Sequence, residues 1–596
     1  MKDDLKFEDP VDLQGKFLPY NYVPAAFGIV AGAPDAMNRI VMMLPGEDAA
    51  RRAAVEYHVV SAENLKNPIG LQRYLSEREF DPYTVHKRCF LGPPTRLEET
   101  ATDGPISFEF APLLVAEGEA VAQVGVIIDI GIAYWNAAFQ SKNGPRFKAI
   151  HYLDFDAYRR GAPALEELPF SQIEAHCAIA NSPGGQESIV ADLGRRFPDS
   201  YFGNHGGAEP GTLWHGTAMA DLMAGLPKDA PDNTVLMGIE LPMAVLRDAD
   251  GDNLGLVLAT LLEGALEITA SQFSGVPLVI ALPWGFTSGP QDRSHPFAIE
   301  IDRVLALHPS RAVKLLVPMG NQMQDRCCGH ILPSDAGEPV NAVIWRIPPD
   351  DFSENSAEFN VVKTGQANQP MVQTKQTVRI TAPTGQTAVI LLEQGWAVFI
   401  SLNGVLIGMI LRAIDTAFGP RLRMTLAPTG WRAGAPKPGL AGDWVLSFNS
   451  SDEACIWVLR DDRDWSLDKA WPRRASHLFD PNYRARDRHD AYLLTDDPAS
   501  AVVRSGTASV LATATLVKAV QADEVLGAAT AQPASYSGVR TSLKAAEISV
   551  LVDVGRHDAG LLAAANGTGQ NMRVSGTSAA VAVAARDVLG LPARLL

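Results

Sequence analysis

The sequence predicts an α/β protein built on an open, doubly wound and mainly parallel sheet, with an inserted β-sandwich and an N-terminal extension. Three observations lead to this prediction. Continuous apolar runs alternate with helical patterns from about residue 121 to residue 330, which is typical of parallel strands joined by crossover helices. Short alternating runs separated by Gly, Pro and Asn replace that pattern over 338–462. The α/β pattern then returns toward the C-terminus, so the β-rich stretch is interpreted as an insertion.

Six apolar runs supply the expected strands of the α/β part. They are residues 124–131, 235–241, 277–282, 314–318, 509–516 and 548–554. Helical patterns at 216–224 and 254–270 lie between some of these runs. In a doubly wound sheet, binding and catalysis gather beyond the carboxyl ends of the strands. Asp129 and Asn321 lie at the ends of two such runs, so we expect both residues at that edge of the sheet.

The inserted β-sandwich is predicted from short runs in which polar and apolar residues alternate. They are residues 377–380, 388–392, 396–400, 405–410 and 443–448. Asn403-Gly404 joins the third and fourth runs, and Asn-Gly is the strongest short signal of a hairpin turn. The surrounding stretch 394–411 is uncharged and long enough to suggest a membrane span. The hairpin is the better interpretation because the turn lies at its middle, and we expect no membrane contact.

These patterns divide the chain into four parts. We assign residues 1–115 to the N-terminal extension, 116–337 to the first part of the α/β domain, 338–462 to the inserted sandwich and 463–596 to the second part of the α/β domain. The extension carries no motif that can be tied to chemistry, and we interpret it as a region that regulates the protein or binds a partner.

Composition narrows the functional classes. The 596-residue chain has 51 basic and 68 acidic side chains and a formal net charge of −17, which argues against nucleic acid and anionic membrane surfaces as partners. Residues 1–8 contain no apolar segment typical of a secretory signal, so a cytoplasmic location is expected. The five cysteines are few and odd in number, which implies no disulfide framework.

The sequence predicts neither a metal site nor another cofactor site. Cys327-Cys328-Gly329-His330 is the best metal-binding candidate, but no second Cys/His pair stands at ligand spacing. We interpret this segment as a solvated or redox-silent loop. The acidic segment 248–253 is a poor calcium loop, because Ala259 stands where a bidentate Glu is required.

Three separated polar residues suggest nucleophilic catalysis. Ser578 opens a helix of Ala and Val, where unpaired backbone N–H groups and the positive end of the helix dipole favour a developing negative charge. Taken alone, this serine could equally cap an ordinary buried helix. His215 can accept the proton of a serine near neutral pH, and a buried carboxylate such as Asp129 can fix the tautomer of the imidazole.

The segments around these three residues carry a family resemblance. In chain order, 129–131, 215–217 and 576–578 resemble the Asp-x-Gly, His-Gly-Thr and Gly-Thr-Ser motifs of the subtilisin-like serine proteases, the subtilase family. The resemblance covers roughly residues 120–330 and 505–590. It implies a subtilisin-like catalytic domain with an Asp-His-Ser triad.

One further position matches the family pattern and another departs from it. Residues 315–321 resemble the family's strand that ends in Gly-Asn. This implies that the side-chain amide of Asn321 donates to the oxyanion, together with the backbone N–H of Ser578. The family usually has a Pro three residues after the serine, where this chain has Val581. The departure changes how the helix begins but removes no reacting group.

The resemblance also implies where a substrate binds, since in this family the peptide lies as an extra strand between two edge segments. The residues that match these segments, with the glycine before Asn321, are Asp250, Gly251, Asp252, Pro283, Trp284, Gly285 and Gly320. The acidic side chains around Gly251 would either attract a basic substrate residue or cap the helix that begins near Asn253.

The function expected from these motifs is that of a serine endopeptidase, which cleaves peptide bonds through an acyl-enzyme. Its partners would be a protein or peptide substrate and a regulatory protein. The alternative is a latent or non-proteolytic scaffold that has the triad but binds a protein partner through the β-sandwich and the N-terminal region. Reaction with a serine-directed probe distinguishes the two functions.

Overall fold

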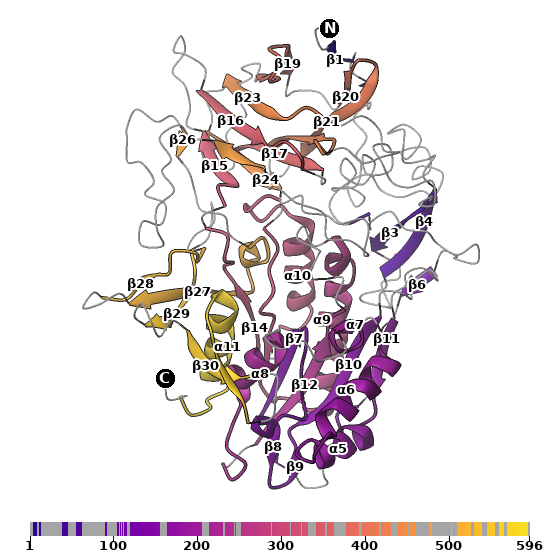
Figure 1. Cartoon of the computed structure of the whole chain (residues 1–596), viewed down its shortest axis with the longest axis vertical. Coiled ribbons are helices and arrows are strands. Elements are labelled where there is room, and N and C mark those ends of the chain that lie inside the picture. The colour runs from indigo at the N-terminus through magenta and orange to yellow at the C-terminus, as the bar shows by residue number, and fades with distance from the viewer. Residues whose placement is uncertain are drawn as a thin grey trace.

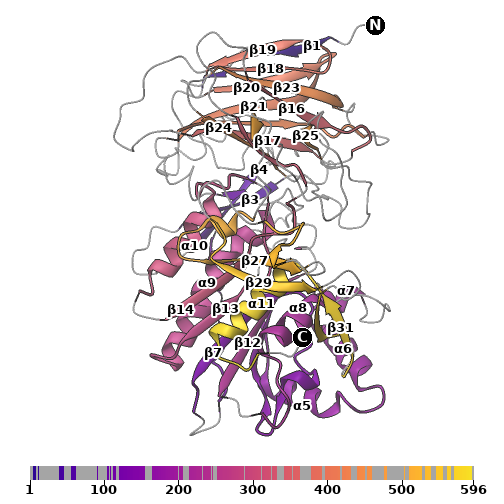
Figure 2. The same cartoon turned by 90° about the vertical axis from the view of Figure 1, so that its left-hand side faces the viewer.

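The protein is a mixed α/β structure with several sheets, arranged in two stacked regions (Figures 1 and 2). The computed structural model describes residues 4–8, 11–12, 39–45, 55–61, 90–91, 104–106, 108, 110, 112–115, 120–154, 164–198, 200–205, 214–230, 233–242, 245, 252–287, 289–309, 312–323, 325–331, 341–351, 354–362, 377–391, 396–415, 419–430, 439–449, 453–459, 476–479, 502–503, 509–525, 530–538, 545–554, 560–565 and 569–593. The α/β region holds one large hydrophobic core, and the β-rich region holds a second one.

The α/β region is organised around a mainly parallel sheet, to which nine strands of the described residues belong. In spatial order these are β11 (Ala164–Leu168), β10 (Phe147–Asp154), β12 (Thr234–Glu240), β7 (Gln123–Asp129), β13 (Leu278–Ala281), β14 (Val313–Pro318), β27 (Lys518–Val525) and β28 (Gln532–Pro533), with β29 (Ile548–Val554) also paired to β27. All neighbours from β10 to β29 run parallel, whereas β11 and β28 pair antiparallel. Five of the apolar runs in the sequence coincide with β7, β12, β13, β14 and β29.

The strand predicted at 509–516 is wrong. These residues form a short 3-10 turn, η4 (Leu511–Thr513), and the strand begins only at Lys518. The N–H of Val510 donates to the carbonyl of Phe286 at 2.6 Å, so the chain here runs against the loop that follows β13 instead of joining the sheet. Residues 509–514 are buried, and a buried turn cannot be told from a buried strand by composition over so short a length.

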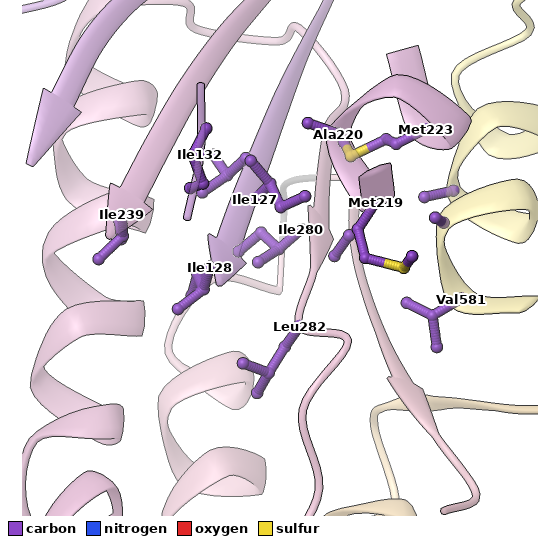
Figure 3. Close-up of a cluster of buried hydrophobic side chains, with 14 of the residues drawn as sticks. Ile127, Ile128, Ile132, Met219, Ala220, Met223, Ile239, Ile280, Leu282 and Val581 are labelled. Atoms are coloured by element: carbon purple, nitrogen blue, oxygen red, sulfur yellow. The ribbon is translucent and has the colours of Figure 1, made fainter. Parts of the chain in front are cut away.

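Two apolar helices, α8 (His215–Ala224) and α11 (Thr577–Val588), pack against each other and against the strands of the sheet. Side chains of α8 lie between the strands and Val581 of α11 (Figure 3). The approach of α8 to β7 is close because Gly125 has no side chain: a Cβ there would lie 2.9 Å from the Cε of Met223. Helices that are apolar on all sides are expected in such a buried position.

The remaining elements of this region flank the sheet. The helices are α5 (Phe170–Ile179), α6 (Gly185–Arg196), α7 (Tyr201–His205), α9 (Asp252–Gln272), α10 (Pro296–Ala306) and the 3-10 turn η1 (Ala137–Phe139). Short antiparallel pairs are formed by β8 (Gln140–Ser141) with β9 (Gly144–Pro145) and by β30 (Leu561–Ala564) with β31 (Asn571–Val574). A small antiparallel sheet comes from the N-terminal part: β5 (Phe90–Leu91), β3 (Arg39–Pro45), β4 (Val55–Ser61) and β6 (Gly104–Ile106).

The β-rich region contains two antiparallel sheets that enclose the second core (Figure 2). The larger sheet has the order β1 (Leu5–Phe7), β20 (Trp396–Leu402), β21 (Val405–Asp415), β22 (Gly419–Leu426), β17 (Asn355–Val362), β24 (Glu453–Leu459), β15 (Cys328–Ile331) and β26 (Val502–Val503), with β2 (Val11–Asp12) also paired to β20. The smaller has the order β19 (Thr387–Leu391), β18 (Thr377–Thr381), β23 (Gly442–Asn449), β16 (Asn341–Ile347) and β25 (His477–Phe479). Trp345 and Trp444 of the smaller sheet and Leu422 of the larger are all fully buried in this core.

The hairpin predicted at Asn403-Gly404 is present between β20 and β21, with positive φ angles of 52° and 77° at its two turn residues. Positive φ at both positions is the conformation that favours Asn-Gly there. The two sheets also include β1, β2, β15, β25 and β26, all of which lie outside residues 338–462. Strand pairing therefore extends beyond the interval that the sequence suggested, and the domain limits stay a prediction.

The Cys327-Cys328 segment is not the solvated loop that we expected. Both cysteines are buried, and Cys328 begins β15, where it faces Trp457 across the sheet. Within the described ranges, no group of three or more His, Cys, Asp or Glu side chains could hold a metal ion. The helices of that part of the chain include none with the length and apolar character needed to cross a membrane.

Candidate active site

Asp129 and His215 form a pair at the carboxyl edge of the parallel sheet. Asp129 is the last residue of β7 and His215 is the first residue of α8, and 86 residues separate them in the chain. The Nδ1 atom of His215 lies 2.8 Å from both carboxylate oxygens of Asp129. Asp129 is fully buried, whereas 28% of the His215 side chain is exposed. The contact fixes the proton on Nδ1 and leaves Nε2 as a proton acceptor.

The start of α8 is held close to the end of β7 by its backbone. Gly216 donates from its N–H to the carbonyl of Ile130 at 2.7 Å, and a Cβ at Gly216 would lie 2.8 Å from the same oxygen. The hydroxyl of Thr217 donates to the carbonyl of Gly131 at 2.6 Å. The residues after His215 therefore require a glycine and a small hydroxyl side chain, which explains the His-Gly-Thr sequence in local terms.

The pKa of His215 reflects two opposing effects. Burial of the ring lowers it, but the negative charge of Asp129 and the hydrogen bond to that carboxylate together raise the pKa above its ordinary value of 6.5. The imidazole is consequently a stronger base than a free histidine. An imidazolium formed by proton transfer would be stabilised by the same carboxylate.

Ser578 is the second residue of α11, and the turn before it has an unusual backbone. Gly576 has φ 107° and ψ 163°, a region that only glycine adopts readily. The Oγ atom of Ser578 donates a hydrogen bond to the carbonyl of Pro283 at 2.8 Å, and among the described residues this carbonyl, not His215, is its partner. Contacts between a nucleophile and its base are often loose in an unliganded site and tighten when substrate binds.

Asn321 follows β14 and contacts the turn that carries Ser578. Its Oδ1 atom accepts two hydrogen bonds from Thr577, from the backbone N–H and from the hydroxyl, each at 2.9 Å. Because a backbone N–H can only donate, this contact assigns the oxygen of the amide to Thr577 and makes the Nδ2 group the donor end of the side chain. That nitrogen lies beside Gly576, 3.2 Å from where a Cβ would be. A neutral donor is thus held beside the turn that leads into Ser578.

The proposed substrate-binding residues are only partly within the described ranges. Asp250 and Gly251 lie outside them, and Asp252 begins α9. Pro283 follows β13 and contacts Ser578 through its carbonyl, and Gly285 passes so close to Ser509 that a Cβ would lie 2.6 Å from the Ser509 hydroxyl. Trp284 is half-buried between them, and Gly320 has φ 94° just before Asn321. A role for these residues in substrate binding stays a prediction.

The sequence patterns do not single out Glu240, which supports the loop after Asp129. Glu240 ends β12 directly beside Asp129 in the register of the sheet, and it is 1% exposed. Its two carboxylate oxygens accept the N–H groups of Gly131 at 2.7 Å and Ile132 at 2.9 Å. The signal that could have revealed it is the same one that revealed Asp129, a carboxylate at the end of an apolar run.

Glu240 gives a testable pH dependence of stability. Burial raises the pKa of Glu240 to about 8, against the opposing effect of the Ile132 and Gly131 N–H groups and with an added contribution from the charge of Asp129. Because the folded-state pKa is raised, the fold is favoured below the ordinary pKa of 4.5 and loses this stabilisation as pH rises through 8. Glu240→Gln is a near-isosteric neutral replacement, so its stability relative to the native protein should increase by roughly 2–4 kcal/mol from pH 5 to pH 9.

Calorimetric unfolding at the two pH values tests this prediction. Glu166→Gln is a matched control, because Glu166 lies on the edge strand β11 and is exposed. If the difference in free energy of unfolding between Glu240→Gln and the parent protein stays constant with pH, Glu240 is ionised throughout this range.

Comparison with known proteins gives a likeness to a solved structure. The sequence matches no protein-family model and no curated protein. One similar solved structure is that of a protease. It is the CspB protease of Clostridium perfringens, with 14% sequence identity, a TM-score of 0.47, and coverage of 78% of this chain and 81% of that chain. At this identity and TM-score the likeness assigns no function to the chain.

Proposed function

We propose that the protein is a serine endopeptidase of the subtilisin-like type, with Asp129, His215 and Ser578 as its triad. The observation that carries the proposal is the Asp129–His215 pair, in which Nδ1 lies 2.8 Å from each carboxylate oxygen at the edge of a parallel sheet. Two further observations support it. Ser578 stands in the first turn of α11, and the Asn321 amide is bonded to the residue just before it. The substrate would be a protein or peptide.

The mechanism follows from the positions of the protons. As the Ser578 oxygen attacks the carbonyl carbon of the substrate, its proton moves to Nε2 of His215 and the carbonyl oxygen becomes an oxyanion. The Nδ2 group of Asn321 and the N–H of Ser578 donate to that oxyanion. His215 then gives the proton to the leaving amine, which departs and leaves an acyl-enzyme. A water molecule then attacks the acyl-enzyme while His215 takes its proton. His215 returns that proton to the Ser578 oxygen as the carboxylic acid product is released.

The hydrogen bond between Ser578 and the Pro283 carbonyl has to break before the Ser578 oxygen can attack a substrate. The hydroxyl of Ser578 donates its proton to the Pro283 carbonyl. The hydroxyl must turn from this carbonyl to Nε2 of His215 before attack. Binding of substrate along the segment after β13 would compete for the same carbonyl, and so would favour that rotation.

A fluorophosphonate probe tests the proposed function directly. The full-length protein should become covalently labelled, and Ser578→Ala should not be labelled. Labelling should also be lost in His215→Ala, because the hydroxyl then lacks its base. A folded native protein that is never labelled and cleaves no peptide would contradict the proposal and would favour a non-proteolytic scaffold.

The role proposed for Asn321 predicts a selective loss of turnover. Asn321→Ala should lower kcat by roughly 10²–10³-fold with little change in KM, because the donor acts on charge that develops in the transition state. Steady-state kinetics on any cleaved peptide provides the measurement. Asn321→Asp is the sharper variant, since it keeps the oxygen that accepts from Thr577 but has no N–H donor. A change confined to KM would exclude Asn321 from the oxyanion site.

A further inference from the structure

The hydroxyl of Tyr536 connects two elements beneath the proposed site. It accepts a hydrogen bond from the backbone N–H of Gly576 at 3.0 Å and donates one to Oδ2 of Asp553 at 2.6 Å. The directions are fixed by chemistry: a backbone N–H can only donate, so the single hydroxyl proton is available for the carboxylate. Asp553 lies in β29, is 7% exposed, and therefore holds the hydroxyl from within the core.

The backbone around Tyr536 also holds the turn that carries Asn321. The carbonyl of Tyr536 accepts the N–H of Met323 at 3.1 Å, and the N–H of Gly538 donates to the carbonyl of Gly320 at 2.9 Å. These bonds lie on the two sides of Asn321 in the chain. The short segment 536–538 therefore contacts both the Asn321 turn and the Gly576 turn.

Two consecutive N–H groups before Ser578 are held by this arrangement. The N–H of Gly576 binds the Tyr536 hydroxyl, and the N–H of Thr577 binds the Asn321 oxygen. The next N–H in the chain, that of Ser578, is the second proposed oxyanion donor. Its position relative to the Asn321 amide is consequently set by two anchors, of which Tyr536 is one.

We propose that Tyr536, oriented by Asp553, is a positioning residue that sets the separation between the two oxyanion donors, the Asn321 amide and the Ser578 N–H. The inference rests on the proposed function and extends it to a residue outside the triad and the two oxyanion donors. Burial, the hydrogen bond to Asp553 and the charge of that carboxylate raise the pKa of Tyr536. The hydroxyl therefore keeps its proton, and the bond to Asp553, across the working pH range.

Tyr536→Phe removes only the hydroxyl and is the primary test. We expect kcat on a cleaved peptide to fall about tenfold with KM changed less than about twofold. A small displacement of the oxyanion donors reduces the stabilisation of the transition state but leaves the binding of the substrate nearly unchanged. The second-order rate of fluorophosphonate labelling should fall in parallel. The matched control is Tyr152→Phe, because the Tyr152 hydroxyl is buried and, among the described residues, has no hydrogen-bond partner. That variant should retain native kinetics.

Variants at Asp553 keep the test decisive if Tyr536→Phe does not fold. Asp553→Asn retains an oxygen that can accept from Tyr536, so its loss of kcat should be smaller than that of Asp553→Ala.

A double variant shows whether the effect passes through the oxyanion site. In an Asn321→Ala background, Tyr536→Phe should reduce kcat by less than it does alone.

Three outcomes overturn the inference. Native labelling and native kcat in Tyr536→Phe exclude a positioning role while leaving the proposed function intact. An equal fold-loss of kcat with and without Asn321 shows that the hydroxyl acts on the fold and not on the oxyanion donors. A native protein that is folded but never labelled overturns both the proposed function and the role of Tyr536.

Discussion

Replacing Ser578 or His215 by alanine is expected to abolish peptide hydrolysis, with a loss on the order of 10⁶ in kcat for either change. The two residues act as one unit: without the imidazole the hydroxyl keeps its proton, and without the hydroxyl the imidazole has no nucleophile to activate. The double variant should therefore be no slower than either single one. Steady-state hydrolysis of a fluorogenic peptide, measured beside thermal unfolding, gives both the loss and the integrity of the fold.

The chain supplies matched controls for both changes. His176 and Asp192 form a second His–Asp pair, with Nε2 and Oδ2 3.2 Å apart, but on α5 and α6. His176→Gln should retain activity, as should Ser271→Ala, because Ser271 is an exposed serine whose hydroxyl donates to the carbonyl of Ile268 in its own helix. Comparable residual activity in Ser578→Ala and in the controls would show that the nucleophile lies elsewhere.

The strands that carry the site were predictable from sequence because they are buried on both faces. The apolar runs at 124–131 and 235–241 correspond to β7 and β12, with limits that differ by one or two residues. Burial on both faces leaves no polar alternation, so the run itself marks the strand. The same reasoning fails at 509–516, where a buried turn has the composition of a strand.

The contacts between residues far apart in the chain were harder to predict. The order of the motifs predicted that Asp129 and His215 act together. In the structure Nδ1 of His215 lies 2.8 Å from Oδ1 of Asp129. The Tyr536 contact to Gly576 spans 40 residues and belongs to no motif. A single hydroxyl on a half-buried ring has many potential partners, so only the arrangement of β29 and the Gly576 turn identifies the one it binds. Sequence patterns reveal reacting groups more readily than the groups that hold them in place.

Asp129→Asn is expected to lower kcat on the order of 10⁴-fold while leaving the fold intact. An amide at this position can present its NH₂ group to Nδ1, which places the imidazole proton on Nε2 and removes the acceptor that Ser578 needs. The imidazolium formed during the reaction also loses its counter-charge. Kinetics on a fluorogenic peptide measures the loss, and Asp192→Asn, which changes the carboxylate beside His176, is the matched control.

The pH dependence provides a second and independent readout of the same change. His215 must be neutral to accept the serine proton, and Asp129 raises its pKa above 6.5 against the effect of burial. In the native protein, kcat/KM should therefore rise with pH through an inflection above 6.5, and in Asp129→Asn the inflection should move to lower pH because burial then acts unopposed. The free energy of unfolding should depend on pH through the same histidine pKa. A raised histidine pKa stabilises the fold below about pH 6.5 and loses that contribution as pH rises through the folded-state value, so the melting temperature of Asp129→Asn should fall furthest below native in acid. An inflection that stays in place or moves upward would mean that a group other than His215 governs the reaction.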